Sequence, residues 1–327
     1  MSRAGEGSEL NGVIGVDIGG TKMAAARVSS GGSLAGDIHA VASSGQSEEG
    51  LVDALLGLLN AEIRRNGPPQ AVGLGCAGTV HRKSGVVVVS PNLPLRGTSL
   101  VSLVEDALDL PTFLDNDANV AALAEVRVGA GIGAQHMLMV TLGTGVGGGL
   151  VLDGEVYRGA SGAAGEVGHM VVKAGGEECR CGSKGCLEAY ASGTALERIA
   201  GNLVREGEDG PMAALLQRGE LDGLSVGRLA KEGDPGALRA VREVGWWLGV
   251  GLAGMANLLE PEIIVIGGGL VELGDILLDP AREVVQEEAL SPVREGVDVR
   301  CARLGADAGI LGAGLMAWEE SGMSPEV

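Results

Sequence analysis

The chain has 327 residues, of which 45% are hydrophobic and only 2% aromatic, with 58 glycines and a formal net charge of -19. This length suits two domains of ordinary size, each with a core of Val, Leu, Ile and Ala. The negative charge argues against polyanion partners, so we expect neither nucleic acid nor an anionic membrane surface. A small nucleotide is not excluded, because backbone N–H groups and Mg²⁺ can neutralise its phosphates locally.

Neither the start of the chain nor its most apolar stretch has the pattern of a targeting or membrane segment. The first dozen residues are polar, so we expect no secretory signal and a loose tail at residues 1–12. Residues 246–259 are apolar but too few to span a bilayer, and a buried helix is the better interpretation. We therefore predict a cytoplasmic protein with reduced thiols.

A strand at residues 13–17, a glycine turn and a second strand at 23–28 predict a hairpin near the N-terminus. Asp17, at the end of the first strand, could hold Mg²⁺ through water. The turn is not a Walker A loop, because no lysine in the chain directly follows a glycine. A plain hairpin is the alternative to a turn that cradles a phosphate. The residues that would form this cradle are Gly19, Gly20, Thr21 and Lys22.

A helix at 47–65, with Ser47 as its N-cap, precedes strands at 71–76 and 86–89. The second of these strands ends in the loop SPNLP. Asn92 lies between the two prolines of this loop. It could exchange hydrogen bonds with a ligand hydroxyl, or it could simply cap a turn.

A strand at 112–114 leads into DNDAN at 115–119 and then into an alanine-rich helix at 120–128. Asp117 therefore lies at or next to the helix N-cap, and a capping role alone is the alternative. The helix dipole would keep its carboxylate ionised, as a base that accepts a hydroxyl proton needs to be. An Asn–Asp pair at the exit of a strand is also where open α/β sheets bind ligands.

The next strand, at 137–142, runs into GTGVGGG at 143–149, which satisfies the dinucleotide fingerprint GxGxxG. That fingerprint requires a helix after the glycines, whereas residues 150–154 predict a strand and a turn. We interpret the segment as a second glycine hairpin, in which Thr144 and Gly145 grip a phosphate.

The segment GEVGHMVVKAGGEECRCGSKGCLE, at residues 165–188, combines one histidine with three cysteines. Zn²⁺ takes Cys₃His ligands tetrahedrally, and four protein ligands leave no place for an activated water. A disulfide is the alternative, but neighbouring Cys-x-Cys thiols pair only with strain. We predict a structural zinc site formed by His169, Cys179, Cys181 and Cys186.

Closure of this loop would also bring Glu166 and Glu188 near His169. Rigidly held acceptors of this kind suit a ligand with many hydroxyl groups. Ordinary solvated carboxylates are the alternative.

The remaining apolar patterns predict a buried strand at 263–266 and helices at 195–205, 235–259 and 306–318. Gly267, Gly268 and Gly269 follow the strand and open a further helix in this interpretation. Glycines there would let an adenine or ribose lie against bare backbone, although close helix–strand packing also explains them.

In chain order, the motifs are a DxGGTK hairpin, a PN loop, DND at a helix start, GTGxGGG, GExGH, CxCGxxGCxE and a GGG turn. This series resembles the ROK family of sugar kinases and sugar-responsive repressors, most closely its bacterial glucokinases, over residues 13 to about 318. GEVGH with CRCGSKGCLE is specific, whereas the glycine turns are generic.

The resemblance implies an actin-like, hexokinase-type fold, in which two ribonuclease-H-like α/β domains close on a cleft. Residues 13–115, joined by a C-terminal helix at about 306–320, would form the small domain. Residues 116–305 would form the large domain, with the zinc-binding loop.

The resemblance also implies ATP-dependent phosphorylation of glucose to glucose 6-phosphate, by direct transfer. Asp117 would be the base on the 6-hydroxyl and Asp17 would help to place Mg²⁺. The two glycine turns would grip the phosphates of ATP, and residues 267–269 would face its adenosine. A homodimer, or a tetramer, is the family-based expectation. The residues implied to bind the sugar are Gly78, Asn92, Asn116, Asp117, Glu166, His169 and Glu188.

Two departures from the family pattern are expected near the rim of the sugar site. Ala77 stands before Gly78 where a proline is usual, and Leu95-Arg96 replaces an aromatic residue that often follows the PNLP loop. They leave open a kinase for N-acetylglucosamine, N-acetylmannosamine, fructose or allose.

A sugar-responsive ROK transcription regulator without its own DNA-binding domain is the alternative from another class. Such regulators need an N-terminal helix-turn-helix, whereas the first glycine hairpin here begins at residue 13, and the negative charge disfavours DNA. A nicotinamide dehydrogenase is a more remote alternative.

Overall fold

The computed structural model describes residues 12–43 and 45–322, and its contacts divide the chain into two units. Unit 1 contains the described residues up to Gly133, the segment Gly149–Gly165 and the segment from Leu304 onward. Unit 2 contains Ala134–Gly148 and Glu166–Arg303. Apart from its last residue, the predicted tail at 1–12 lies outside the described residues.

The contact division differs from the predicted boundary between residues 115 and 116. Helix α3 (Asp117–Val128), expected in the large domain, packs against α11 (Ala308–Glu320) and belongs to unit 1. The backbones are very close, since a Cβ at Gly312 would lie 1.7 Å from the carbonyl oxygen of Val120.

Unit 1 is built on a five-stranded sheet that begins with the predicted hairpin. β1 pairs with β2 in antiparallel fashion, and β1, β4 and β8 are parallel neighbours. β1 and β4 are buried along almost their whole length, as expected of parallel strands covered on both faces of a sheet. The order across the sheet is β3 (His39–Ala42), β2 (Lys22–Val28), β1 (Val13–Ile18), β4 (Val72–Cys76) and β8 (Thr112–Asn116).

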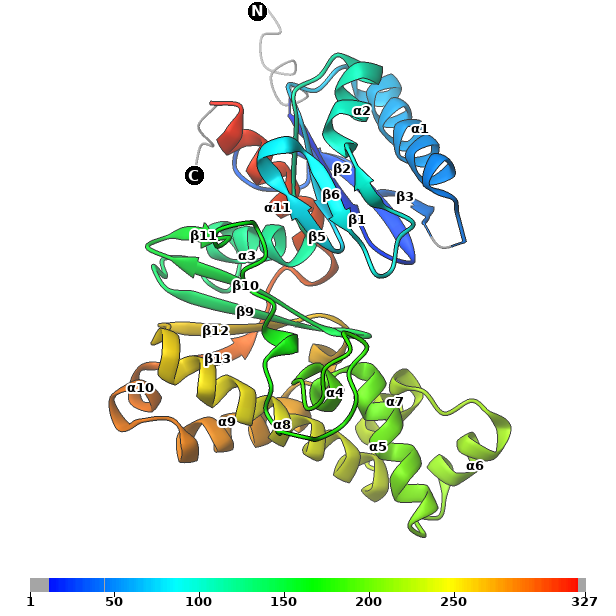
Figure 1. The fold of residues 1–327 in the computed structure, drawn as a ribbon, viewed down its shortest axis with the longest axis vertical. Coiled ribbons are helices and arrows are strands. Elements are labelled where there is room, and N and C mark those ends of the chain that lie inside the picture. Colours follow the sequence, from blue (N-terminus) through cyan, green and yellow to red (C-terminus); the bar gives the residue numbers. More distant parts are fainter. Residues whose placement is uncertain (1–11, 44, 323–327) are drawn as a thin grey trace, which may run out of the picture. The chain divides into compact units, whose positions relative to one another are not determined.

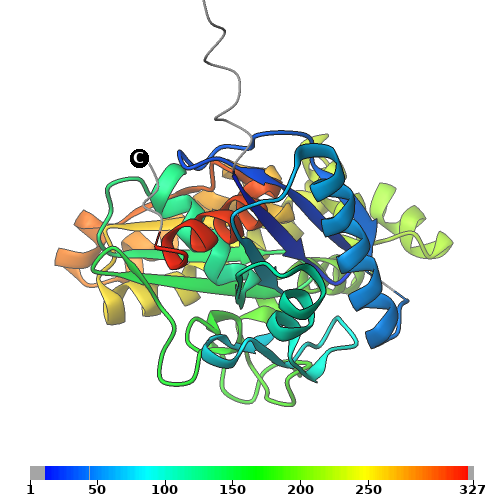
Figure 2. The same ribbon diagram turned by 90° about the horizontal axis from the view of Figure 1, so that it is seen from above.

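Helices cover the two faces of this sheet. Ile14 and Val16 of β1 join a buried cluster with Leu55 of α1 (Glu48–Asn66) and Leu100 of α2 (Leu100–Leu108). α1 begins as predicted, with the Ser47 side chain accepting the N–H of Gly50. α11 covers the opposite face, as Figures 1 and 2 show from two directions.

α11 approaches the sheet closely because glycines face it. A Cβ at Gly15 of β1 would lie 2.0 Å from the carbonyl oxygen of Ile310, and one at Gly73 of β4 would lie 1.8 Å from that of Ala313. No side chain fits in this space, so backbone packs directly on backbone. A helix near the C-terminus thereby completes the core of a sheet made from the first residues of the chain.

A small antiparallel sheet in unit 1 carries the PN loop between its second and third strands. The side chain of Leu95, in this loop, is 2% exposed and lies in the core. The expectation that Leu95 lies at the rim of the sugar site was therefore wrong, and only Arg96 of that pair is exposed. The strands are β5 (Thr79–His81), β6 (Val86–Val89) and β7 (Arg96–Thr98).

Unit 2 contains a parallel array in which β12 (Ile263–Gly267) lies between β9 (Met137–Leu142) and β13 (Asp298–Cys301). α8 (Pro235–Leu259) begins as predicted after Asp234, whose side chain accepts the N–H of Ala237. The other helices of unit 2 are α4 (Glu188–Ala191), α5 (Gly193–Arg205), α6 (Pro211–Arg218), α7 (Gly223–Lys231), α9 (Asp275–Glu288) and α10 (Ser291–Gly296).

β10 (Val146–Leu152) begins in unit 2 and ends in unit 1, where it pairs with β11 (Glu155–Tyr157). A strand therefore follows the second group of glycines, as predicted, and the helix that a dinucleotide fingerprint requires is not formed there. None of the helices in the described part of the chain combines the length and apolar character needed to cross a membrane.

Candidate active site

The predicted site residues of unit 1 lie where its parallel strands end. Ile18, at the end of β1, is in register with Cys76 at the end of β4, and Cys76 is in register with Asn116 at the end of β8. The first glycine turn (residues 19–22), Gly78 and Asp117 therefore follow three neighbouring strand ends. Open α/β sheets bind their ligands at this edge.

Asp117 is the first residue of α3, and Asn116 is its N-cap. Oδ1 of Asn116 accepts the N–H groups of Ala118 at 2.9 Å and Asn119 at 3.2 Å. Its Nδ2 donates to Oδ1 of Asp117 at 2.8 Å and to the carbonyl oxygen of Gly78 at 3.0 Å. Both polar atoms of Asn116 thus brace Asp117, and the contact of Asn116 with a sugar stays a prediction.

Position 78 requires glycine. Its φ is 121°, and a Cβ there would lie 2.5 Å from the carbonyl oxygen of Val89. Because its own carbonyl oxygen accepts from Asn116, this turn after β4 helps to fix the start of α3. The contact of Gly78 with a sugar stays a prediction.

Two carboxyl groups at this edge have raised pKa values. Burial raises the pKa of Asp117, although the N–H of Ala118 and the side chain of Asn116 lower it. Burial, together with the charge of Asp117, raises the pKa of Asp17 to about 6, against the opposing charge of Lys22. The helix dipole was expected to keep this carboxylate ionised; burial acts in the opposite direction, because desolvation outweighs the local hydrogen bonds and raises the pKa of Asp117.

The first glycine turn is closed by a bond from the N–H of Gly19 to the carbonyl oxygen of Lys22 at 3.1 Å. Ser43 was not predicted as a site residue. It donates its hydroxyl to the carbonyl oxygen of Gly19 at 2.5 Å and its N–H to that of Thr21 at 3.0 Å. Among the described residues, the N–H groups of Gly20 and Thr21 have no hydrogen-bond partner. Free amides in a turn can bind an anion.

Gly20 also contacts the PN loop. A Cβ at Gly20 would lie 2.7 Å from the Cβ of Asn92, so only glycine permits this approach. The structure thereby brings the predicted phosphate turn and the predicted sugar-binding Asn92 together within unit 1. Asn92 itself is exposed.

The second glycine turn (residues 143–145), in unit 2, rests on Glu188. Oε2 of Glu188 accepts the N–H of Val146 at 2.9 Å, and a Cβ at Gly145 would lie 2.3 Å from this oxygen. Thr194 donates its hydroxyl to the carbonyl oxygen of Thr144 at 2.9 Å, while Thr144 is exposed. Glu188 is therefore a structural support of the turn and not merely a solvated carboxylate.

Gly267, Gly268 and Gly269, at the end of β12, differ in their structural surroundings. Gly268 has φ 83°, and its Cβ would lie 2.4 Å from the carbonyl oxygen of Leu142, so packing alone explains it. Gly267 is beside Thr141, and Gly269 faces open space, with no atom within 4 Å of an added Cβ. Gly269 opens a short 3₁₀ helix and not the predicted α-helix, which begins later at Asp275.

The Cys₃His cluster (His169, Cys179, Cys181 and Cys186) fits a tetrahedral metal ion. All four donor atoms lie within 4.8 Å of one another. Sγ of Cys181 lies 3.7 Å from Sγ of Cys186, and Sγ of Cys179 lies 3.7 Å from Nδ1 of His169. A tetrahedron with zinc–sulfur bonds of roughly 2.3 Å has edges of about 3.8 Å. The donors therefore match zinc, and the cysteines are free thiols.

The electrostatic surroundings of the thiols differ. The N–H of Ser183 lowers the pKa of Cys181 to about 7, whereas burial raises the pKa of Cys179 to about 12. Zinc binds thiolates, so its binding releases the protons of these groups.

The two glutamates lie beside this cluster. Nε2 of His169 is 3.9 Å from Oε2 of Glu166, so the ring nitrogen that faces away from the thiols points to a carboxylate. Oε1 of Glu188 lies 3.7 Å from Sγ of Cys179. Since the other oxygen of Glu188 binds Val146, this one residue joins the cluster to the second glycine turn.

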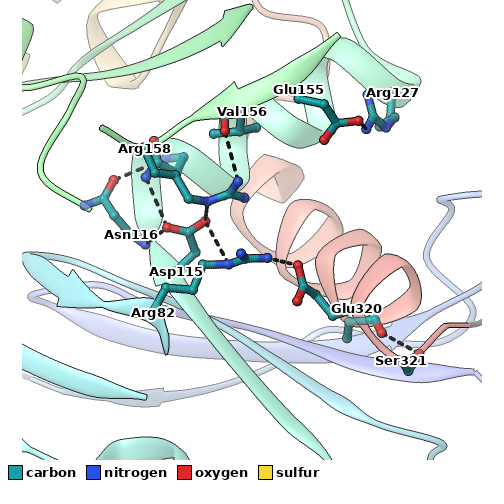
Figure 3. Close-up of polar contacts among 11 residues, drawn as sticks. Arg82, Asp115, Asn116, Arg127, Glu155, Val156, Arg158, Glu320 and Ser321 are labelled. Carbon is teal, nitrogen blue, oxygen red and sulfur yellow. Dashed lines mark hydrogen bonds and ion pairs between the residues drawn. The ribbon is translucent and has the colours of Figure 1, made fainter. Parts of the chain in front are cut away.

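The charged residues around Asp115 were not predicted to belong to the site. Asp115 is buried in β8, and Figure 3 shows Arg158 and Arg82 directed at its carboxylate from two sides. An acid at the end of an apolar strand is a signal that partners are needed, but the sequence does not show which residues they are.

Comparison with known proteins agrees with these features. Residues 13–320 match the ROK family. The chain is 38% identical to a glucokinase of Halalkalibacterium halodurans, over 95% of this chain and 96% of that protein. It is 32% identical to a putative xylose repressor of Caldicellulosiruptor sp., over 92% of this chain and 76% of the repressor.

The structure resembles that of a ROK family glucokinase from Streptomyces griseus in complex with glucose and AMPPNP. The TM-score is 0.82 at 38% identity, with 94% of this chain and 99% of that chain covered. The likeness confirms the predicted actin-like, hexokinase-type α/β fold. On the match over residues 13–320 and on these identities, the chain belongs to the ROK family.

Proposed function

We propose that this chain is an ATP-dependent hexokinase that phosphorylates glucose at its 6-hydroxyl, with Asp117 as the general base. The observation that carries the proposal is the position of Asp117 at the shared end of β1, β4 and β8, next to Asp17 and the first glycine turn. The likeness to glucokinases, one of them solved with glucose and AMPPNP, supports the choice of sugar and nucleotide.

Asp117 would take the proton as the sugar oxygen attacks the γ-phosphorus of ATP and ADP leaves. The bonds from Asn116 and Ala118 both use Oδ1, so we assign proton acceptance to Oδ2. A pKa raised by burial makes the carboxylate a stronger base than a solvated aspartate, which favours proton transfer at neutral pH.

The amides of Gly20 and Thr21 would bind phosphate oxygens, and Thr144 and Gly145 would form the second phosphate grip. Asp17 and Asp117 are neighbouring carboxylates with raised pKa values, so a cation beside them is favourable. Mg²⁺ suits oxygen donors of this kind, and when bound it neutralises the charge that develops on the transferred phosphoryl group.

The Cys₃His cluster would hold zinc as a structural ion. His169 would then be fixed by zinc at Nδ1 and by Glu166 at Nε2. Glu166, His169 and Glu188 would bind sugar hydroxyls in unit 2, and Gly78, Asn92 and Asn116 would do so in unit 1. We also propose a domain boundary near residue 115, a homodimer and a cytoplasmic location.

Two other functions have specific support. Ala77 and Arg96 depart from the family pattern, which favours a kinase for another hexose. The likeness to the xylose repressor favours a sugar-responsive regulator, but its identity is lower and the charge of -19 disfavours DNA.

A direct test measures ADP release from MgATP with a panel of hexoses and N-acetylhexosamines. We expect rapid turnover with glucose. Turnover with another sugar would keep the reaction and change the substrate. Sugar binding without turnover on any sugar would favour the regulator.

A further inference from the structure

Asp115 is a buried carboxylate two residues before Asp117, and four partners hold it within unit 1. Its Oδ1 accepts the N–H of Asn116 at 2.8 Å and Nδ2 of Asn119 at 3.1 Å. Its Oδ2 accepts Nε of Arg158 at 2.5 Å and lies 3.9 Å from Nε of Arg82. One oxygen thus binds the turn that contains Asp117, and the other binds two guanidinium groups (Figure 3).

Asp115 makes hydrogen bonds to residues on both sides of Asp117 in the sequence. Asn116 precedes Asp117 and Asn119 follows it, so Asp115 fixes the base turn (residues 115–119) at two points. Asn116 in turn donates to Oδ1 of Asp117. A displacement of Asp115 would therefore move the carboxylate of Asp117 through a chain of direct hydrogen bonds.

Arg158 is the strongest partner of Asp115. A charge-assisted bond of this kind is stronger than a neutral hydrogen bond, and the guanidinium has its direction set by a second bond from Nη1 to the carbonyl oxygen of Val156 at 3.0 Å. Arg82 is farther from Asp115 and also pairs with Glu320. The position of Asp115 therefore depends mainly on Arg158.

We propose that Arg158 is a positioning residue, which through Asp115 holds the base turn and so directs the carboxylate of Asp117. The inference rests on the proposed function, because it assigns to Arg158 a part in the same phosphoryl transfer. Arg158 does not itself supply or accept a proton. Its loss should displace the base while leaving the amides that bind ATP where they are.

Arg127 provides a matched control in the same unit. Its Nε donates to a carboxylate, that of Glu319, at 2.8 Å, and its Nη1 donates to a backbone carbonyl oxygen, that of Gly154, at 2.8 Å. Its side chain is 22% exposed, the same as that of Arg158. Among the described residues, Glu319 makes no hydrogen bond to the base turn and influences it only through its charge near Arg82, so Arg127 has the stabilising role without a direct positioning role.

The experiment compares Arg158→Gln with Arg127→Gln in kcat, in KM for glucose and ATP, and in Tm. We expect kcat of Arg158→Gln to fall about 10²-fold, because small displacements of a reacting group are costly. KM for ATP should change less than about twofold, and Arg127→Gln should keep kcat within about twofold. An unchanged kcat in Arg158→Gln, or an equal loss in both variants, would overturn the inference.

A second measurement does not depend on the sugar. Hydrogen exchange at the amides of Asn116, Ala118 and Asn119 should be at least about tenfold faster in Arg158→Gln than in Arg127→Gln. If exchange is faster in Arg158→Gln but the protein phosphorylates no sugar, the proposed function is contradicted and the positioning role is kept. If exchange in Arg158→Gln is unchanged, the positioning role is contradicted, whichever sugar is the substrate.

Removal of Arg158 leaves the buried carboxylate of Asp115 with two hydrogen bonds and the more distant cation of Arg82, which can prevent folding. In that case the double variant Asp115→Asn/Arg158→Gln removes the unpaired charge and is measured in the same way. Its kcat should also be reduced about 10²-fold, and a value within about threefold of the wild type would contradict the proposal.

Discussion

The predicted site residues of the two units are held by different means. In unit 1, strand ends, an Asn N-cap and the buried Arg158–Asp115 pair fix Asp117 through the polypeptide alone. In unit 2, His169 and Glu188 are arranged around three thiols whose geometry suits a metal ion. The geometry of the site residues in unit 1 therefore depends on hydrogen bonds, whereas that of the residues in unit 2 depends on a Cys₃His cluster that fits a metal ion.

The largest effect should come from Asp117→Asn. We expect kcat to fall roughly 10²–10⁴-fold, because an amide cannot accept the proton. The same change should raise the free energy of unfolding at pH 7 by roughly 1 kcal/mol. The sign follows from the raised pKa: the folded state favours the neutral form of this carboxyl, so its ionised form costs stability.

The control for Asp117→Asn is Asp222→Asn, at the N-cap of α7 in unit 2. The N–H of Ser225 lowers the pKa of Asp222, so here the ionised form is favoured in the folded state. Loss of the charge should lower Tm and leave kcat unchanged. If both variants shift Tm in the same direction, the contrast between the two carboxylates is mistaken.

The next largest effect should come from Cys181→Ser, which removes a ligand of the Cys₃His cluster. We expect zinc to be lost and kcat/KM for glucose to fall about 10²-fold. Elemental analysis and steady-state kinetics measure these effects, with the exposed Cys301→Ser as control. Amide exchange in the base turn should stay unchanged, since unit 1 does not need the metal. Full activity without zinc would remove the cluster from the mechanism.

A smaller effect separates packing from binding in unit 2. Gly269 faces open space, so Gly269→Ala should leave Tm unchanged and raise KM for ATP about tenfold if adenosine lies there. Gly268→Ala meets the backbone of Leu142 and should lower Tm instead. An unaltered KM in Gly269→Ala would mean that these glycines serve packing only.

The smallest effect concerns pH. Because burial raises the pKa of Asp117 and the base must be ionised, kcat/KM should decline on an acidic limb that begins above the usual range of an aspartate. The profile is measured at saturating MgATP, so that the nearby Asp17 is in one state. A rate that stays flat down to about pH 4 would contradict the raised value.

Local patterns were sufficient for much of the fold. Gly19 and Gly20 between two apolar runs predicted the hairpin of β1 and β2, and Asp234 before a proline predicted the start of α8. The Cys₃His ligands were also within reach of sequence, because three of them lie within eight residues of one another. In these cases the signal and the structure involve the same short segment.

Features that depend on distant contacts were not predicted. Arg158 is 43 residues from Asp115, and no local pattern joins them. Helix α2 begins after Ser99 without a side-chain cap, so its start has no signal. The helix dipole was expected to keep the carboxylate of Asp117 ionised, whereas burial, which depends on the tertiary structure, raises its pKa.

The close packing of α11 on β1 and β4 has a consequence for biosynthesis. The chain leaves the ribosome from its N-terminus, yet the sheet that begins at Val13 has one face only partly covered, by α3, until Ala308–Glu320 arrive. Unit 2 is complete once Arg303 has been made. The half of the molecule that is translated first is therefore the last that can finish folding, and its unpaired apolar face must be kept from aggregating in the meantime.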